Sequence, residues 1–365
     1  MNDSNTGLTC LTVRLGAIAE NFHVCGEISG AAVAGVVKAD AYGLGLAPVA
    51  RTLADAKCST FFVARLEEGL ALRPLLPDAR IFVLDGVLSE SVEALVTHRL
   101  IPVLNSLDDI AIWSGAARAR QTVLDAALHF DTGMNRLGLP PDELSTLSSE
   151  RPRRLTGINT VLVMSHLACS DDPSAPMNEN QLERFRAGLA MLPPAPASLA
   201  ASGGVLLGKA FAFDLVRPGV ALYGGNPQRG IPNPFKTVAV LTGRILQLRR
   251  VDKGESVGYG ATFRAARPST LATVALGYAD GLMCAIGNKL AGALDGIPIP
   301  VAGRVSMDLI TLDVTDVPSA ALGDEIEFIG DTISLEDAAA AAGTVNYEIL
   351  TGLGSRFPRR YVSAT

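Results

Sequence analysis

The chain has 365 residues, 48% hydrophobic and 19% charged, so it is a globular protein with room for roughly two domains and not a disordered chain. Its net charge of -6 and its pI of about 5.3 argue against nucleic acid or an anionic membrane as a partner. No apolar stretch approaches the roughly 20 residues of a membrane helix. The N-terminus has no basic region followed by an apolar stretch, so we expect no secretory signal.

The cysteines are odd in number and form no C-x-x-C pair. We therefore expect buried, reduced thiols in a cytoplasmic protein, and we assign no metal site. These cysteines are Cys10, Cys25, Cys58, Cys169 and Cys284.

In the first part of the chain, up to about residue 225, short apolar segments alternate with helix-compatible segments. This alternation predicts a (β/α)8 TIM-like barrel, with a doubly wound open sheet as the alternative. One helix is expected over 67–75, and another is expected to begin at Asn178 as N-cap, with Gln181 as its capping-box partner. The expected strands are 33–37, 60–64, 80–84, 100–104, 123–130, 158–165, 198–202 and 213–217.

Turn-forming residues are concentrated at 224–234 and predict a domain boundary. We expect a barrel domain over 8–230 and a β-rich C-terminal domain over 231–365, which residues 1–7 could join. The second domain should also contain one alanine-rich helix, capped by Ser334. Its expected elements are strands at 237–251, 271–276, 297–301, 309–314 and 325–329 and the helix at 335–342.

Polar residues follow the expected barrel strands at their C-terminal ends, where barrels of this type carry their active sites. A single histidine in such a place is more often a packed core residue than a catalyst. Six positions on one face, however, indicate a functional site. They are Lys38, His129, Arg136, His166, Ser202 and Arg217.

Lys38 follows the apolar segment 31–37 directly. Its amine should be partly desolvated there, which lowers the pKa of a lysine and lets the neutral amine form a Schiff base with an aldehyde. The alternative is a lysine that merely extends from a strand end into solvent.

The segment 217–224 places Gly219 at the start of a short helical stretch after the last strand. Free backbone N–H groups in such a place favour an anion. Barrels often bind phosphate after strands seven and eight, and Ser202 ends the seventh strand. An ordinary Pro-Gly turn is the alternative.

Seven segments, taken in chain order, resemble the motifs of alanine racemases, which are fold-type III pyridoxal-phosphate enzymes. The first contains Lys38 followed four residues later by Tyr42, and the resemblance extends over nearly the whole chain. The segments are 37–43, 131–138, 217–219, 257–260, 277–281, 303–308 and 356–361.

The resemblance implies that Lys38 binds pyridoxal 5'-phosphate as a Schiff base and acts as one of two bases. Tyr259, from the second domain, would be the other base and would act in the site of the partner subunit of a homodimer. Cofactor contacts are implied for the phosphate at Tyr42, Ser202, Gly219, Val220 and Tyr347, and for the pyridine ring at Arg217 and His166.

The resemblance also assigns a substrate site. Arg136 and the backbone at Met307 would receive the substrate carboxylate, and Tyr278 would line the entrance. Asp308 is assigned to the same substrate site.

The chain departs from the family pattern at three positions. The family usually has a lysine modified to a carbamate where this chain has His129, and a histidine cannot form that stable carbamate. We expect instead a bound small anion such as chloride, or a neutral His129 that accepts a hydrogen bond from Arg136. The other two departures are Ala201 for an asparagine and Ser306 for a cysteine.

The implied activity is the interconversion of L-alanine and D-alanine, which would supply D-alanine for peptidoglycan or for catabolism. A racemase of broader specificity, for example for serine, is an alternative, because one hydroxyl is poorly discriminated by an apolar pocket. Two further alternatives are a non-catalytic barrel that binds pyridoxal phosphate and a decarboxylase of the same two-domain plan. The first would have no need of Tyr259.

Overall fold

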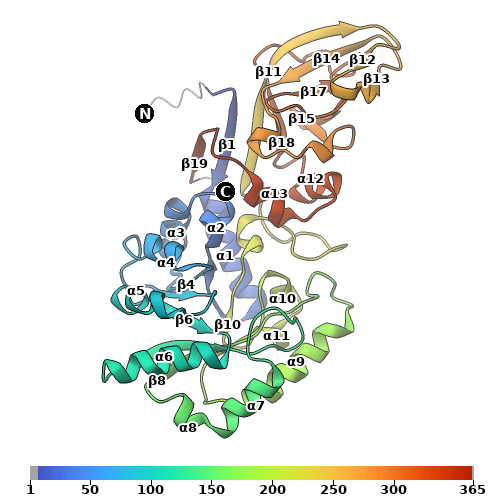
Figure 1. The fold of residues 1–365 in the computed structure, drawn as a ribbon. Coiled ribbons are helices and arrows are strands. Elements are labelled where there is room, and N and C mark those ends of the chain that lie inside the picture. The colour runs from blue at the N-terminus through green and yellow to red at the C-terminus, as the bar shows by residue number, and fades with distance from the viewer. Residues whose placement is uncertain (1–6, 364–365) are drawn as a thin grey trace.

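The structure is a computed structural model that describes residues 7–363. It consists of a barrel, formed by the blue, green and yellow parts of the chain, and a mostly β domain, formed by the orange and red parts (Figure 1). Strand β1 (Thr9–Arg14) lies between the two and connects them.

The barrel is a closed ring of parallel strands. Strands β3 to β9 are hydrogen-bonded in chain order, and β10 pairs with β2. A parallel bridge between Ala201 and Arg217 joins the ends of β9 and β10, while β2 and β3 are two halves of one strand interrupted at Ala34. The sheet therefore closes, which confirms the predicted barrel and excludes the doubly wound alternative.

All eight expected barrel strands are present, although the seventh and eighth are shorter than expected. Every residue of β4 and β6 is buried, as is typical of parallel strands that are covered on both faces. The strands are β2 (Ala32–Val33), β3 (Gly35–Val36), β4 (Thr60–Val63), β5 (Arg80–Val83), β6 (Ile101–Leu104), β7 (Leu124–His129), β8 (Ile158–Met164), β9 (Ala197–Ser198) and β10 (Leu215–Val216).

Helices follow the strands and cover the outside of the barrel. The helix expected over 67–75 is α4, but the expected capping box at Asn178 is wrong. Helix α9 begins earlier, at Pro176, and proline suits the first position of a helix. Gln181 lies inside this helix and its side chain is fully buried. The right-handed barrel helices are α1 (Leu15–Ser29), α3 (Leu46–Asp55), α4 (Leu66–Leu72), α5 (Val92–Thr97), α6 (Leu107–Ala119), α7 (Pro141–Ser149), α8 (Arg151–Arg154), α9 (Pro176–Leu189), α10 (Ser202–Leu206) and α11 (Lys209–Ala212).

The second domain is built on the long strand β11 (Ala239–Val251), and each strand and the helix expected there are found. The Ser334 side chain accepts a hydrogen bond from the Asp337 N–H and caps α12, as predicted. The other elements are β12 (Ser256–Val257), β13 (Phe263–Arg264), β14 (Ser269–Val274), β15 (Ala291–Leu294), β16 (Ile297–Pro300), β17 (Ile310–Asp313), β18 (Glu325–Ile329), α12 (Leu335–Ala342), α13 (Asn346–Gly352) and β19 (Arg359–Val362).

Strand β1 ties the start of the chain to its end. It pairs antiparallel with β11 and parallel with β19. We expected residues 1–7 to join the second domain; residues 1–6 lie outside the described residues, and the strand that joins is Thr9–Arg14. One cluster of buried apolar residues continues from the barrel into the second domain, so the two share a core.

The five cysteines carry free thiols, but they are not all buried as expected, because Cys169 is half-buried and Cys284 is exposed. Over residues 7–363, no helix is both long and apolar enough to cross a membrane.

Candidate active site

A cavity of about 800 Å³ opens at the C-terminal ends of the barrel strands. All six polar residues that the sequence placed at this end of the barrel line it, although they are spread over 180 residues of the chain. Tyr347 of α13 reaches the cavity from the second domain. The expected site residues that line it are Lys38, Tyr42, His129, Arg136, His166, Ser202, Arg217, Gly219 and Tyr347.

Lys38 stands at the start of a turn with an unusual backbone. The segment Lys38–Tyr42, labelled α2, contains three consecutive residues, Ala39 to Ala41, with φ of 53° to 54°, and Tyr42 follows with φ 58°. For residues other than glycine, this left-handed conformation costs roughly 1 kcal/mol or more per residue. The surrounding contacts must therefore hold the turn.

The environment of Lys38 favours a neutral amine. Its side chain is half-buried, and desolvation together with the nearby Arg136 charge lowers the pKa of Lys38. The negative charges of Glu68 and Asp85 raise the pKa of Lys38, but they do not cancel the decrease. The sequence predicted this direction from the strand end alone.

Ser202 and the loop after β10 form a compact polar corner. The Ser202 Oγ accepts hydrogen bonds from the backbone N–H groups of Gly219 (2.8 Å) and Ala221 (3.2 Å). The short helical stretch predicted to start at Gly219 is the 3-10 turn Val220–Tyr223, with Gly219 as its N-cap, so the Val220 N–H has no partner within that turn.

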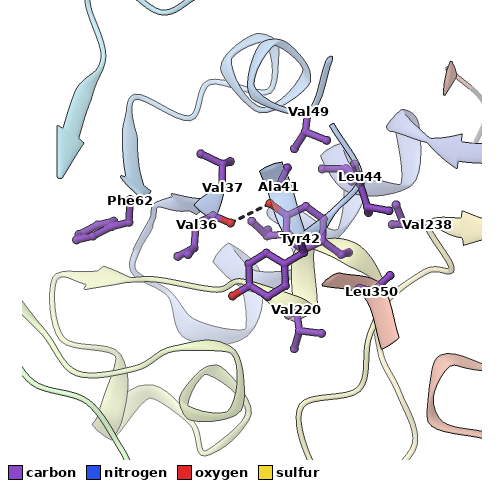
Figure 2. Packing of buried hydrophobic residues seen from close by; sticks show 14 of the residues in the cluster. Val36, Val37, Ala41, Tyr42, Leu44, Val49, Phe62, Val220, Val238 and Leu350 are labelled. Carbon is purple, nitrogen blue, oxygen red and sulfur yellow. Dashed lines mark hydrogen bonds between the residues drawn. The ribbon is translucent and has the colours of Figure 1, made fainter. Parts of the chain in front are cut away.

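Gly219 is required at this corner because Tyr42 approaches it closely. A Cβ on Gly219 would lie 2.1 Å from the Tyr42 hydroxyl oxygen. Figure 2 shows Tyr42 packed among apolar side chains that include Val220 and Leu350. The Tyr42 ring is therefore fixed, and desolvation raises its pKa well above the ordinary value, so the hydroxyl stays protonated and can donate.

Arg217 lies beneath the cavity and is 4% exposed. Its guanidinium donates to the Ser165 backbone oxygen (2.6 Å) and to the Ser198 hydroxyl, which fixes its orientation. Burial lowers the pKa of Arg217 to about 9, which still leaves it protonated at neutral pH. Arg217 thus presents a fixed, permanent donor to the cavity.

His129 is buried and neutral. Desolvation, followed by the charge of Arg217, lowers the pKa of His129 to about 4. Its Nδ1 lies 2.7 Å from the Asn105 Oδ1, and the Asn105 amide nitrogen donates to the Leu84 and Val103 backbone oxygens (3.0 Å each). Since the Asn105 oxygen can only accept, His129 carries its proton on Nδ1 and leaves Nε2 as an acceptor.

The hydrogen bond between His129 and Asn105 agrees with the expected neutral His129 but not with the expected partner. His129 is neutral, as one alternative required, but its hydrogen-bond partner is Asn105, and the described residues contain no hydrogen bond between His129 and Arg136. Arg136 is exposed on the loop after β7, whose backbone is organised by the Asp131 carboxylate through N–H groups such as that of Met134 (2.9 Å).

A second buried network supports His166. The Gln181 side chain donates to the His166 backbone oxygen (2.9 Å) and to the Thr132 hydroxyl (2.9 Å), and it accepts from the Ala168 N–H (2.8 Å). Desolvation and the charge of Arg217 lower the pKa of His166 well below its ordinary value, so its ring is neutral too.

Four of the five site residues expected from the second domain, all except Tyr347, do not line this cavity. Tyr259 is 72% exposed and lies between β12 and β13, at the end of the second domain far from the barrel (Figure 1). Tyr278 and Met307 are also exposed and lie together, since the Ala279 N–H donates to the Met307 oxygen (2.9 Å). Asp308 is exposed and forms an ion pair with Arg356 (2.8 Å).

Sequence reasoning missed several residues that shape the cavity. Asn105 follows β6 directly, so the rule that selected the other strand-end residues could have selected it. Gln181 was taken for a helix cap, and no local signal predicted that it would instead reach Thr132 and His166. Glu68 was not singled out either, although its carboxylate accepts from the Ala39 N–H.

The cavity fits a phosphorylated aldehyde. Arg136 and Arg217 bring positive charge to it, and Lys38 has a lowered pKa suited to a Schiff base. The polar ends of Lys38, Tyr42, Arg136, His166 and Tyr347 make no hydrogen bond to the part of the chain that the structure describes. A closed barrel with this site fits an enzyme that uses pyridoxal phosphate.

The comparison with known families names the class more narrowly. Residues 13–227 match the family model described as alanine racemase, N-terminal domain, and residues 238–361 match alanine racemase, C-terminal domain. This chain belongs to the alanine racemase family, whose members are pyridoxal-phosphate-dependent racemases.

Individual relatives agree with this assignment. An alanine racemase of Rhodospirillum rubrum is 49% identical over 99% of this chain and 98% of its own length. A catabolic alanine racemase of Agrobacterium fabrum is 46% identical over 96% of this chain and 92% of its own length. The crystal structure of the Bartonella henselae alanine racemase, with covalently bound pyridoxal phosphate, superimposes with a TM-score of 0.93 at 39% identity, covering 98% of this chain and 100% of that one.

Proposed function

We propose that this protein interconverts L-alanine and D-alanine with pyridoxal 5'-phosphate bound to Lys38. The observation that carries this proposal is the convergence on one cavity of Lys38, the Ser202–Gly219 corner and the fixed Arg217. The family assignment favours a racemase over the decarboxylase and over a non-catalytic cofactor-binding barrel.

The phosphate of the cofactor would be bound at the polar corner. The Ser202 hydroxyl lines this part of the cavity, and the Val220 N–H and the hydroxyls of Tyr42 and Tyr347 would donate to the phosphate. Loss of hydration raises the pKa of Tyr347 to about 12, so this phenol also stays protonated and donates. The close approach permitted by Gly219 brings the Tyr42 hydroxyl to the same anion.

Arg217 would donate to the pyridine nitrogen and His166 would lie beside the ring. The cofactor, once bound, supplies the electron sink that makes the substrate Cα proton removable. Because Arg217 remains protonated, it donates a hydrogen bond without transferring its proton to the ring, which limits reprotonation at the wrong carbon. The neutral His166 adds no second charge.

Racemisation requires a proton to leave one face of Cα and another to be added on the opposite face. The Lys38 amine would serve one face, since desolvation lowers the pKa of Lys38 and so favours the neutral amine, which can accept a proton at Nζ. The Tyr259 hydroxyl would serve the other face. Within one subunit Tyr259 is exposed and remote from the cavity, so it must come from the partner subunit.

A two-fold dimer would bring the two bases together. The second domain exposes further apolar side chains, namely those of Tyr278, Met307 and Leu309, and the first two of these residues lie together. We infer that this surface covers the partner's cavity, with Tyr278 at the entrance and the Met307 backbone and Asp308 near the substrate carboxylate that Arg136 binds.

The reaction would either supply D-alanine for peptidoglycan or bring D-alanine into catabolism. We also infer a cytoplasmic site of action, where the five free thiols stay reduced. Polarimetry on L-alanine tests the proposal: rotation should fall to zero from either enantiomer. A cofactor-loaded protein that leaves alanine unchanged would refute it, and faster conversion of serine would favour the broader-specificity alternative.

A further inference from the structure

The left-handed turn Lys38–Tyr42 links two residues of the proposed cofactor site, Lys38 at its start and Tyr42 at its end. Residues other than glycine rarely adopt this conformation in succession, because the Cβ approaches the next carbonyl oxygen. Local hydrogen bonds hold part of the segment: the Asp40 carboxylate accepts from the Leu46 N–H (2.7 Å), and the N–H groups of Ala41 and Gly43 donate to the backbone oxygens of Val37 (3.0 Å) and Ala39 (2.8 Å). Other contacts come from distant parts of the chain.

The first distant contact is made by Glu68 of α4. One oxygen of its carboxylate accepts from the Ala39 N–H (2.6 Å), directly after Lys38. The other accepts from the N–H groups of Ala64 (2.8 Å) and Arg65 (3.1 Å), at the end of β4 and the start of α4. A single carboxylate therefore ties the start of the turn to the rigid end of a barrel strand.

The second distant contact is made by β19, at the end of the chain. The Arg359 guanidinium donates from Nε (3.0 Å) and from a terminal nitrogen (2.8 Å) to the Gly43 oxygen, and that nitrogen also donates to the Gly354 oxygen (3.1 Å). The Tyr361 hydroxyl donates to the Leu44 oxygen (3.0 Å). These bonds lie directly after Tyr42.

The glycines of the turn allow this close contact. A Cβ on Gly45 would lie 2.1 Å from the Tyr361 hydroxyl oxygen, and a Cβ on Gly43 would lie 2.7 Å from the Leu350 oxygen of α13. Helix α13 also carries Tyr347 into the cavity. The end of the chain thus contacts both the turn and the cavity.

We propose that Glu68, Arg359 and Tyr361 are positioning residues that hold the left-handed turn, so that Lys38 and Tyr42 are presented together to the cofactor. The proposal rests on the proposed function in one respect, the role of Lys38 as the cofactor lysine. It assigns a role to the C-terminal motif 356–361. Through this motif the second domain would shape the cofactor site of its own subunit.

The test compares Arg359→Met and Tyr361→Phe with Arg360→Met. Arg360 is a matched control, because it is the neighbouring residue on β19 and its side chain is exposed and bonds to the Thr12 hydroxyl (3.1 Å), away from the turn. Hydrogen–deuterium exchange of the peptide 38–46 is measured with and without pyridoxal phosphate. Cofactor affinity is measured by titration of the cofactor-free enzyme.

Arg359→Met should accelerate exchange in this peptide and weaken cofactor binding, each on the order of tenfold, as expected for loss of hydrogen bonds from a charged donor. Arg359→Lys should restore part of the protection from exchange and part of the cofactor affinity. Arg360→Met should change neither the exchange nor the affinity. Glu68→Gln should shift the pH at which the absorbance of the Lys38-bound cofactor titrates, since it removes a charge beside Lys38.

Exchange in 38–46 that is equal in Arg359→Met and Arg360→Met would overturn the proposal. Faster exchange with unchanged cofactor affinity and an unchanged absorbance titration would also overturn it. Should Arg359→Met unfold the whole chain, Tyr361→Phe decides, since it deletes a single oxygen atom. The exchange measurement without cofactor remains decisive even if the protein does not racemise alanine, so failure of this proposal is distinguishable from failure of the proposed function.

Discussion

Acidification should destabilise this protein through His129, by an amount that follows from its burial. The pKa of His129 falls from 6.5 to about 4 in the folded chain, a difference of about 2.5 units. At 1.36 kcal/mol per unit, the folded state loses up to about 3 kcal/mol relative to the unfolded chain. Between these two pKa values the unfolded chain binds the proton and the folded chain does not, so stability falls as the pH drops from 6.5 toward 4.

The assay is urea unfolding of the wild type and of His129→Gln at fixed protein concentration, at several values between about pH 7 and pH 4. Glutamine is neutral throughout this range and its amide can still donate to the Asn105 oxygen. His166 and every other titrating group is present in both proteins, so the difference between the two curves isolates His129.

The wild type should lose about 3 kcal/mol more than His129→Gln across this interval. A difference between the two proteins that stays constant from neutral pH to pH 4 would contradict a buried, neutral His129. The prediction would also fail if the variant lost more stability than the wild type on acidification.

Three further predictions concern the cofactor site. Lys38→Ala should abolish both the visible absorbance of bound cofactor and racemisation in both directions; substantial activity without added amine would refute the assignment. Activity should not depend on dissolved carbon dioxide, because His129 cannot form a carbamate, whereas His129→Lys should introduce a dependence on bicarbonate; a bicarbonate requirement in the unmodified enzyme would contradict this account. Gly219→Ala should weaken cofactor binding by roughly 10- to 100-fold, since it displaces the Tyr42 hydroxyl from a charged acceptor, while Gly115→Ala, where a Cβ meets nothing within 4 Å, should not.

The barrel and its strand-end residues could be predicted from sequence because each depends on a local pattern. Lys38 and Arg217 follow apolar segments whose period and length predict strands, and the closure of the barrel then brings the strand ends together. The polar corner at Ser202 was predictable for the same reason, since Gly219 and the 3-10 turn after it are adjacent in the chain.

The remaining features depend on contacts between distant residues, which no local pattern encodes. The left-handed turn after Lys38 is held from α4 and β19, and the Ala39–Tyr42 segment contains no glycine to signal it. The expected alternatives at His129 were a bound anion or a hydrogen bond from Arg136, because the family's carbamate compensates that charge, but the partner in the structure is Asn105 from the neighbouring strand. Gln181 has the spacing of a capping residue, and only burial reveals its other role.

Complementation between two inactive variants tests whether the active site is shared between subunits. We propose that Lys38 of one subunit and Tyr259 of its partner serve opposite faces of one substrate. Lys38→Ala and Tyr259→Phe proteins, mixed in equal amounts after demonstrated subunit exchange, should regain about a quarter of the wild-type sites by the statistics of random two-fold pairing. A mixture that remains inactive would contradict a site shared between subunits.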